Sequence, residues 1–311
     1  MSSKTVLRVA LIAGGTSSER EVSLKGARAV EKALRELGHK VEFFDPATDL
    51  LKLAQRAGEF DAAFLVLHGK GGEDGTIQGF LELLGLPYQG AGVLGSALAM
   101  HKGLSKKLYQ LAWVPVPRGE TFHKGHASSK EMVKHAKWLG FPLVVKPATH
   151  GSSVGMSLVE NEKELFKALD LAFIYDDEVL IEEYIQGREI TGGILEEKPL
   201  PLVEIIPKGS KYFDYETKYT PGKAEEVCPA PLDEKLTEKG KNYALIAHKV
   251  LKLRHYSRTD MILKDDEFFV LETNTIPGMT ETSLLPLAAK VAGLSFKDLV
   301  QKLLEFALKK S

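Results

Sequence analysis

The sequence predicts a mixed fold, in which an α/β unit with a parallel sheet is followed by α+β units. Strand and helix patterns alternate over roughly the first 95 residues, and Pro115-Val116-Pro117 is typical of an extended linker. Strand patterns dominate from about residue 185 to Cys228. A chain of 311 residues is long enough for two or three domains. We therefore expect units at residues 1–100, 101–184 and 185–311.

The first unit is expected to place polar chemistry in two loops. Strands are predicted at residues 6–13, 40–44 and 62–67, and helices at 22–37, 50–56 and 77–84. Parallel sheets bind ligands at the carboxyl ends of their strands. The loops after Ala13 and Leu67, both rich in glycine and charge, are therefore the expected sites. A further helix at residues 95–112 is predicted to carry Met100-His101-Lys102.

The other two units are predicted to combine strands with fewer helices. The second has strands at residues 143–146 and 178–184, a strand ending at Val159, and a helix at 162–173. The third has mostly strands up to Cys228, then a helix at 234–253, two paired strands and two C-terminal helices. No internal repeat interrupts this order.

Composition indicates an ordinary globular protein. Apolar residues make up 44% of the chain and charged residues 27%, and the net charge of -1 gives no indication of a nucleic-acid partner. No apolar run approaches the ~20 residues that cross a bilayer, and the first residues do not resemble a signal peptide. We expect a cytoplasmic protein that binds no membrane. Cys228 is the only cysteine, and we interpret it as a small buried hydrophobe.

Three oxygen donors are predicted to form a metal site. Glu272 and Asn274 end an apolar strand and, two residues apart, face the same side. If residues 256–263 form the neighbouring strand, with a turn at Asp265-Asp266, Asp260 joins them. Two carboxylates and an amide carbonyl suit Mg²⁺, which takes further ligands from phosphates. On these residues alone, a charged strand end before a turn is an equally good interpretation.

A second group of residues is suited to bind an anion. Lys146 ends an apolar strand and is followed by the Gly151-Ser152-Ser153-Val154-Gly155 loop, whose N–H and hydroxyl groups could cover phosphates. Without the lysine, a simple hairpin turn would be the better interpretation. Glu182 and Glu183 alternate faces at another strand end, so one could reach a ribose or adenine, or both could be solvated. Glu189 could be a further acceptor, or half of a surface pair with Arg188 or a neighbour.

Two common nucleotide-binding signatures can be checked directly in this sequence. No G-x-x-x-x-G-K-[ST] segment occurs, which excludes a Walker-type phosphate loop. Residues 90–95 match G-x-G-x-x-G before a helix, but no acidic residue follows about 20 positions later, where a ribose contact is expected. We interpret this segment as a helix-packing turn, which disfavours a nicotinamide enzyme.

The order of these residues, with Lys102 added, resembles that of ATP-grasp enzymes. Further motifs resemble the family of D-alanine–D-alanine ligases: Gly14 to Ser23, His68-Gly69 with Gly71-Gly72-Glu73-Asp74-Gly75, and Asn274-Thr275 with Pro277-Gly278-Met279-Thr280. The likeness runs through nearly the whole chain. It implies an ATP-grasp fold with an N-terminal Rossmann-like domain, and commonly a homodimer.

The resemblance implies a two-step ligation. ATP phosphorylates the carboxylate of one D-alanine, and the amine of a second attacks to give D-alanyl-D-alanine for peptidoglycan synthesis. Two Mg²⁺ ions, replaceable by Mn²⁺, are implied, with Glu272 bridging both. The family usually has an acid where His101 stands. The implied metal ligands are Asp260, Glu272 and Asn274, and the implied ATP-binding residues are Lys102, Lys146, Ser152, Ser153, Glu182, Glu183, Ile185 and Glu189.

The resemblance also implies the amino-acid sites. Glu19 would hold the ammonium of the first D-alanine, Arg258 and the Gly278 N–H would stabilise the oxyanion, and Ser283 with the Leu284 backbone would hold the second carboxylate. The alternative for Ser283 is a plain helix cap. His68 would lie beside the first substrate or only fix a glycine-rich turn.

A loop at residues 212–219 resembles the family's ω-loop, which closes over the site. Ser152 would link Glu19 to Tyr219, a tyrosine whose presence favours D-alanine as acceptor, although it could also be a surface aromatic. Lys218 nearby would favour a neutral attacking amine. The alternatives are a ligase that uses D-lactate or D-serine as acceptor, and a nucleotide-binding regulator without catalysis.

Overall fold

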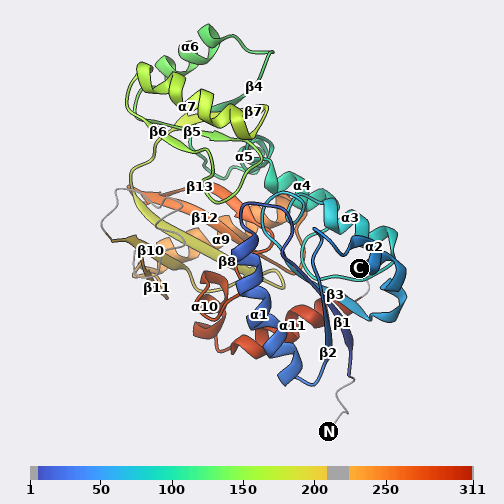
Figure 1. Cartoon of the computed structure of the whole chain (residues 1–311). Helices are drawn as coiled ribbons and strands as arrows, with labels where there is room; N and C mark the ends of the chain where they lie inside the picture. The colour runs from blue at the N-terminus through green and yellow to red at the C-terminus, as the bar shows by residue number, and fades with distance from the viewer. Residues whose placement is uncertain (1–5, 209–223, 310–311) are drawn as a thin grey trace.

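The computed structural model describes residues 6–208 and 224–309 and contains three sheets. One sheet lies in each of the three proposed units, and Figure 1 shows them with the central unit at the top. The mixed parallel and antiparallel architecture confirms the predicted fold class. The 212–219 loop, with Lys218 and Tyr219, lies outside the described residues.

The first sheet is parallel, with strand order β2-β1-β3. Its strands are β1 (Arg8–Ala13), β2 (Lys40–Phe44) and β3 (Ala62–Val66). The residues of β1 from Val9 to Ala13 are fully buried, because helices cover both faces of a parallel sheet. The helices α1 (Arg20–Glu36), α2 (Leu50–Arg56) and α3 (Thr76–Leu83) lie within two residues of the predicted bounds. A short 3₁₀ turn (Ala57–Glu59) that was not predicted follows α2.

The single helix predicted at residues 95–112 is wrong, because the chain forms two helices. These are α4 (Val93–Met100) and α5 (Lys102–Leu111), separated by His101 in an extended conformation. The Lys102 N–H donates to the Ala148 carbonyl (2.9 Å), and this tertiary contact leaves no trace in the apolar periodicity. His101 Nδ1 caps α5 by accepting from the Leu104 N–H (3.3 Å). The break makes Lys102 the first residue of α5.

The glycine-rich segment at the start of α4 packs against the turn at residues 251–253. Gly92 is the N-cap of α4. A Cβ at Gly95 would lie 2.9 Å from Leu253 Cδ2 and 3.0 Å from the Lys252 carbonyl, so only glycine fits without a shift. Cys228 is only half-buried, because it lies at the margin of a core cluster rather than within it, so its interpretation as a buried hydrophobe is corrected.

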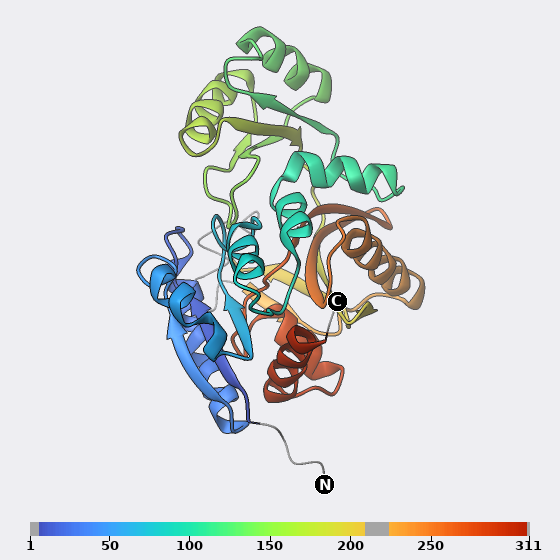
Figure 2. The ribbon, with the colours of Figure 1, turned by 90° about the vertical axis from the view of Figure 1, so that its right-hand side faces the viewer.

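The second sheet is antiparallel, with strand order β4-β7-β5-β6. Helices α6 (Ser129–Leu139) and α7 (Glu162–Tyr175) share one core cluster with one face of this sheet. Figure 2 shows this unit above the other two, with α4 and α5 beneath it. The other face carries Val144, Lys146 and Glu182 toward the rest of the molecule. The strands are β4 (Gly119–His123), β5 (Leu143–Pro147), β6 (Ser157–Val159) and β7 (Glu178–Glu183); β4 and α6 were not predicted.

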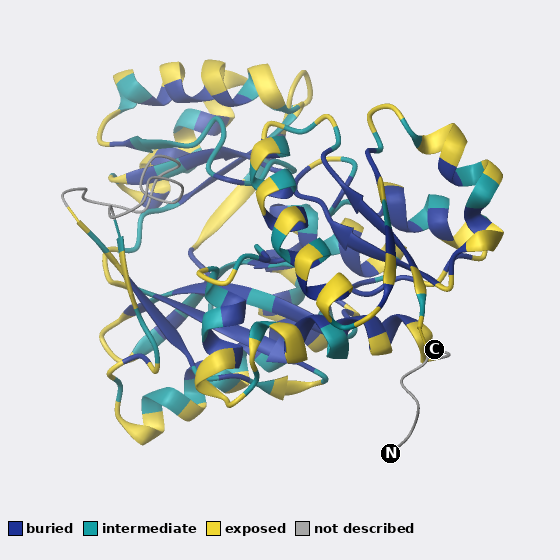
Figure 3. Cartoon of the chain, turned by 60° about the horizontal axis from the view of Figure 1, so that its bottom comes forward, coloured by how far each residue is buried: buried dark blue, intermediate teal, exposed yellow. Residues whose placement is uncertain are grey.

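The third sheet follows the path β11-β10-β8-β12-β13, with β9 paired to β8. Helix α9 (Glu234–Val250) packs on one face, and α11 (Phe296–Leu308), which follows α10 (Leu284–Val291), packs beside α1 (Figure 1). In Figure 3 the strands are largely buried while the outer faces of the helices are exposed. The strands are β8 (Arg188–Leu195), β9 (Lys198–Pro199), β10 (Val203–Pro207), β11 (Ala224–Val227), β12 (Tyr256–Lys264) and β13 (Glu267–Asn274).

None of the helices within residues 6–208 and 224–309 has both the length and the apolar character needed to cross a membrane.

Candidate active site

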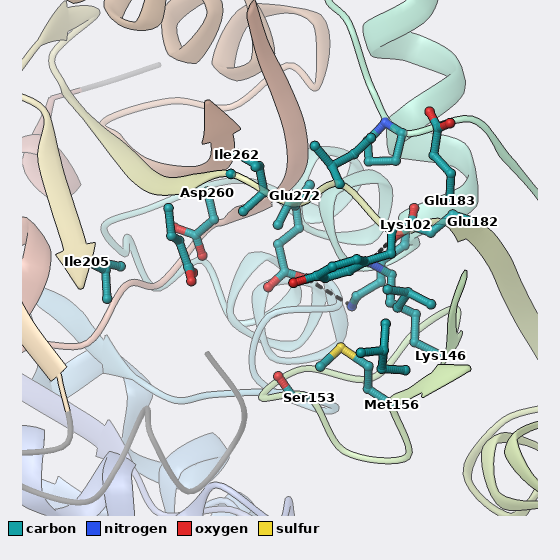
Figure 4. Close-up of a pocket in the computed structure, with 18 of the residues that line it drawn as sticks. Lys102, Lys146, Ser153, Met156, Glu182, Glu183, Ile205, Asp260, Ile262 and Glu272 are labelled. Atoms are coloured by element: carbon teal, nitrogen blue, oxygen red, sulfur yellow. Dashed lines mark ion pairs between the residues drawn. The ribbon is translucent and has the colours of Figure 1, made fainter. Parts of the chain in front are cut away.

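A cavity of about 360 Å³ lies between the free face of the second sheet and the third sheet. Both predicted lysines and both predicted carboxylates line it: Lys102 and Lys146 with Asp260 and Glu272 (Figure 4). Val144, Met156, Leu158, Ile262 and Leu271 give the cavity an apolar part beside these charges. The arrangement is suited to a ligand with a polyanionic end and an apolar end.

The acids owe their position to an irregularity in strand pairing. Asp260 pairs with Glu272 and Arg258 with Asn274, but Met261 pairs with Val270, so Leu271 is an extra residue in β13. Val270 is fully buried on the core side. With strict alternation Glu272 would face the same way as Val270, whereas the bulge turns it to the cavity. The predicted turn at Asp265-Asp266 joins the two strands.

Asp260 is surrounded by hydrogen-bond donors. Arg258 donates to it twice, from Nε (2.9 Å) and from a terminal nitrogen (2.7 Å), Thr191 Oγ1 donates at 2.8 Å, and Asn274 Nδ2 donates at 3.1 Å. The described residues contain no group of three or more His, Cys, Asp or Glu that could hold a metal ion. The predicted set has only two carboxylates plus an amide. Its hard oxygen donors, adjacent in register on one face, fit a magnesium ion.

Each lysine of the cavity is paired with an acid. Lys102 Nζ lies 3.3 Å from Glu272 Oε2 and donates to the His150 carbonyl at 2.5 Å. Lys146 Nζ lies 2.6 Å from Glu182 Oε1 (Figure 4). These lysines and Glu182 are all buried. The cavity is therefore charge-compensated before any ligand enters it.

Four of the other predicted nucleotide residues line the cavity, whereas Ser152 is not among its lining residues. Ser153, Glu183, Ile185 and Glu189 are among its lining residues. Glu183 also forms an ion pair with Arg118 (2.8 Å). Arg188, which was considered as a partner of Glu189, pairs with Glu204 at 2.7 Å.

The glycine-serine loop reaches the first unit. Ser152 Oγ donates to Glu19 Oε1, which is the first half of the predicted link to Tyr219. Ser152 and Ser153 both have positive φ values, 51° and 59°, a conformation that non-glycine residues rarely adopt. The contact with Glu19 helps to hold this strained turn in place.

Residues of the predicted first-substrate site meet at the loops after β1 and β3. A Cβ at Gly69 or at Gly151 would lie 2.9 Å from Glu19 Oε2, so both backbones approach this carboxylate closely. His68 is buried, and its Nε2 has no hydrogen-bond partner in the described part of the chain. Burial lowers the pKa of His68, nearby Glu19 opposes this shift and Arg258 adds to it. A neutral imidazole is expected there.

Gly278 and Ser283 adjoin each other at the start of α10. A Cβ at Gly278 would lie 3.1 Å from Ser283 Oγ. Ser283 occupies the N-cap position but makes no side-chain cap bond, and instead accepts from the Thr280 N–H at 3.1 Å. Ser283 therefore holds the cap position of α10 without making the side-chain cap bond. Leu284 is the first residue of the helix, so its N–H is one of the amides that an α-helix leaves without an internal acceptor.

Known proteins match this chain along almost all of its length. The family model described as D-ala D-ala ligase C-terminus matches residues 106–305, and the model described as D-ala D-ala ligase N-terminus matches residues 44–91. The chain belongs to the D-alanine–D-alanine ligase family.

Several relatives in this ligase family are close in sequence and structure. The chain is 51% identical to the D-alanine–D-alanine ligase of Syntrophobacter fumaroxidans over 97% of its own length and 98% of that protein. It is 51% identical to the ligase of Desulfotalea psychrophila, over 98% and 96% of the two chains. The crystal structure of the Bacillus anthracis ligase complexed with ATP superposes with a TM-score of 0.86 at 35% identity, covering 98% of each chain.

Two side chains of this ligase family member were not identified as site residues from the sequence. Lys106 lies 2.8 Å from Glu182 Oε2, and its position one helical turn after Lys102 was the available signal. Glu73 accepts from the Gly69 N–H (3.0 Å) and the Ile276 N–H (3.1 Å), which joins the loop after β3 to the loop after β13. Burial and then Glu19 raise the pKa of Glu73 to about 8. No local pattern indicates the contact between Glu73 and Ile276.

Proposed function

We propose that the protein is an ATP-dependent D-alanine–D-alanine ligase that forms ADP and phosphate. The observation that carries this conclusion is the cavity in which Asp260 and Glu272, directly paired across two strands, face Lys102 and Lys146. Such a constellation is suited to phosphoryl transfer, in which positioning and charge compensation supply most of the catalysis. The family membership identifies the substrates.

The first step activates a poor electrophile. A carboxylate oxygen of the first D-alanine attacks the terminal phosphorus of ATP, a new P–O bond forms, and the bond to ADP breaks. Lys102 and Lys146 would offset the charge on the phosphates. Ser152 and Ser153 would add donors from the loop, while Glu182, Glu183, Ile185 and Glu189 would face the nucleoside.

Two magnesium ions fit the acidic side of the cavity, and Mn²⁺ is a chemical substitute. Asp260, Glu272 and Asn274, which are adjacent in register on β12 and β13, would hold them. When bound, the ions neutralise phosphate charge that the lysines alone cannot balance.

The second step forms the peptide bond. The amine of the second D-alanine attacks the acyl carbon of D-alanyl phosphate, the C–N bond forms, phosphate leaves, and the amine loses its proton. Arg258 and the Gly278 N–H would stabilise the oxyanion. Glu19 would hold the first ammonium, with His68 beside it, and Ser283 with the Leu284 N–H would hold the second carboxylate at the start of α10.

The choice of acceptor is assigned to the loop at residues 212–219. Tyr219 would complete the link through Ser152 to Glu19, and Lys218 would disfavour the ammonium form of the acceptor. We therefore propose D-alanine as acceptor, and a cytoplasmic homodimer as the working form.

An assay of ADP release tests the proposal. Purified protein with ATP and Mg²⁺ is given no amino acid, D-alanine alone, or D-alanine with D-lactate or D-serine. We expect turnover that depends strictly on D-alanine, with D-alanyl-D-alanine as the only product. An ester or a D-alanyl-D-serine product would change the acceptor assignment. ATP binding without D-alanine-dependent turnover would favour a nucleotide-binding regulator.

A further inference from the structure

The nucleotide cavity contains two ion pairs that loosen if a triphosphate binds as proposed. Lys102 is paired with Glu272 at 3.3 Å, and Lys146 with Glu182 at 2.6 Å. Each lysine would turn its ammonium toward phosphate oxygens, which weakens its pairing with the acid. Glu272 is one of the residues that would hold a metal ion, whose charge would replace that of Lys102. Glu182 belongs to no metal set, so a different cation must compensate its charge.

Lys106 occupies the position from which that compensation can come. Its Nζ lies 2.8 Å from Glu182 Oε2, whereas Lys146 contacts Oε1. Glu182 is 2% exposed and Lys106 is 5% exposed, so water contributes little to either charge. Glu182 and Lys146 line the cavity, whereas Lys106 is not among its lining residues.

We infer that Lys106 is a positioning residue of the nucleotide site, the counter-ion that keeps Glu182 ionised and in place when Lys146 turns to the phosphates. This inference rests on the proposed function. It gives the three lysines different roles, because Lys102 and Lys146 contact the nucleotide whereas Lys106 acts only through Glu182.

The electrostatics of the group agree with this role. Burial by itself raises the pKa of Glu182, but Lys106 and then Lys146 outweigh burial, and the pKa lies below its ordinary value. Burial lowers the pKa of Lys106 to about 8, Glu182 opposes this shift, Lys146 adds to it, and Glu272 opposes it weakly. Both partners are therefore charged at neutral pH. An acid buried without a counter-ion would be strongly destabilised.

Steady-state kinetics of Lys106→Met test the inference. We expect the KM for ATP to rise about tenfold or more, with the KM values for D-alanine within about twofold of wild type. Lys107→Met is the matched control, because Lys107 is the next residue of α5 and is exposed. The control is expected to keep the wild-type KM for ATP. Equal KM values for ATP in the two variants would overturn the inference.

A second comparison isolates the route through Glu182. In a Glu182→Gln background there is no buried charge to compensate, so Lys106→Met is expected to raise the KM for ATP no further. A rise in the KM for ATP as large as the one that Lys106→Met causes in the wild-type protein would show that Lys106 acts independently of Glu182, and would overturn the inference. If Lys106→Met alone does not fold, the double variant Lys106→Met with Glu182→Gln is still expected to fold and to have the same KM for ATP as Glu182→Gln. A double variant that does not fold, or that has a higher KM for ATP, also overturns the inference.

The inference and the proposed function fail in different ways. If wild-type protein shows no D-alanine-dependent turnover, the proposed function fails. The same variants are then compared for binding of Mg-ATP by calorimetry, where about tenfold weaker binding by Lys106→Met than by Lys107→Met is expected, and equal binding overturns the inference.

Discussion

The nucleotide end of the site and its amino-acid end are built in different ways. At the nucleotide end the charged groups stand on regular elements and are paired, as Lys146 on β5 is with Glu182 on β7. At the amino-acid end Glu19 and Glu73 come from loops next to the first sheet, and the pKa of Glu73 is raised to about 8 by burial and by Glu19. The first end is ready for a polyanion that brings its own cations. The second end has an excess of carboxylate that an ammonium group would relieve.

The largest effect is expected where the nucleotide end loses a metal-binding charge. Glu272→Gln keeps the shape of the side chain but removes the carboxylate that faces Lys102 and pairs with Asp260. We expect dipeptide formation to fall by about three orders of magnitude or more, because one side chain serves both proposed ions. The rate of ADP release at saturating D-alanine measures the loss.

The control for this variant lies on the same strand. Glu267→Gln changes the first residue of β13, which contacts Lys239 away from the cavity, and is expected to keep activity. Near-normal ligation by Glu272→Gln, in protein that melts like wild type, would remove the metal assignment and with it the proposed contrast between the two ends.

A smaller and more selective effect is expected at the amino-acid end. Glu73→Gln weakens the link between the Gly69 and Ile276 amides, which lie on loops of different units. We expect kcat/KM for D-alanine to fall about tenfold while the KM for ATP stays within about twofold. Asp74→Asn, a change in the same loop that spares the contact with Ile276, is the control. A rise in the KM for ATP alone would contradict the assignment of Glu73 to the amino-acid end.

The same variant has a pH signature. The pKa of Glu73 is raised to about 8 in the folded protein, so the folded state holds a proton that the unfolded state has released above roughly pH 4.5. The contribution of Glu73 to stability is complete below roughly pH 4.5 and is lost as pH rises through 8. Relative to Glu73→Gln, wild-type protein is therefore expected to lose stability between pH 5 and 8 in denaturant titrations. An unchanged difference across this range would contradict the raised pKa.

Ser152 joins the two ends, so its variant is expected to affect both. Ser152→Ala removes the hydrogen bond to Glu19 while the loop retains Ser153. We expect the KM values for ATP and for D-alanine to rise together, each about threefold to tenfold, because the loop faces the nucleotide and the carboxylate at once. Ser153 lines the cavity, so Ser153→Ala is expected to change only the KM for ATP. Identical behaviour of the two serine variants would show that the link to Glu19 has no effect on function.

The comparison also explains what could be predicted from the sequence. Asp260, Glu272 and Lys146 were identified because strand alternation and strand ends place side chains by simple rules. Even there the β-bulge at Leu271 went unseen, since it depends on pairing with β12. The fold class followed from the same periodicities and from the resemblance to a family.

Residues whose role depends on contacts distant in sequence were missed. Glu73 was part of a motif, but its bond to the Ile276 N–H spans 203 positions and has no local signature. The helix break at His101 was missed because the contact of Lys102 with Ala148 is tertiary. Lys106 was overlooked although helical spacing puts it near Lys102, because the acid that it contacts lies on another element.

The smallest effect is expected at His101, where the nucleotide end meets the break between α4 and α5. Its Nδ1 caps α5 and its Nε2 lies 3.0 Å from Glu178 Oε2 on β7. His101→Ala loses both contacts and is expected to cost about 1 kcal/mol, or about 2 °C in melting temperature. His101→Asn keeps a good cap but is too short to reach Glu178. If the cap positions Lys102, His101→Asn is expected to keep the wild-type KM for ATP and His101→Ala to raise the KM about threefold. If the contact of His101 with Glu178 positions Lys102 instead, both variants raise the KM for ATP equally.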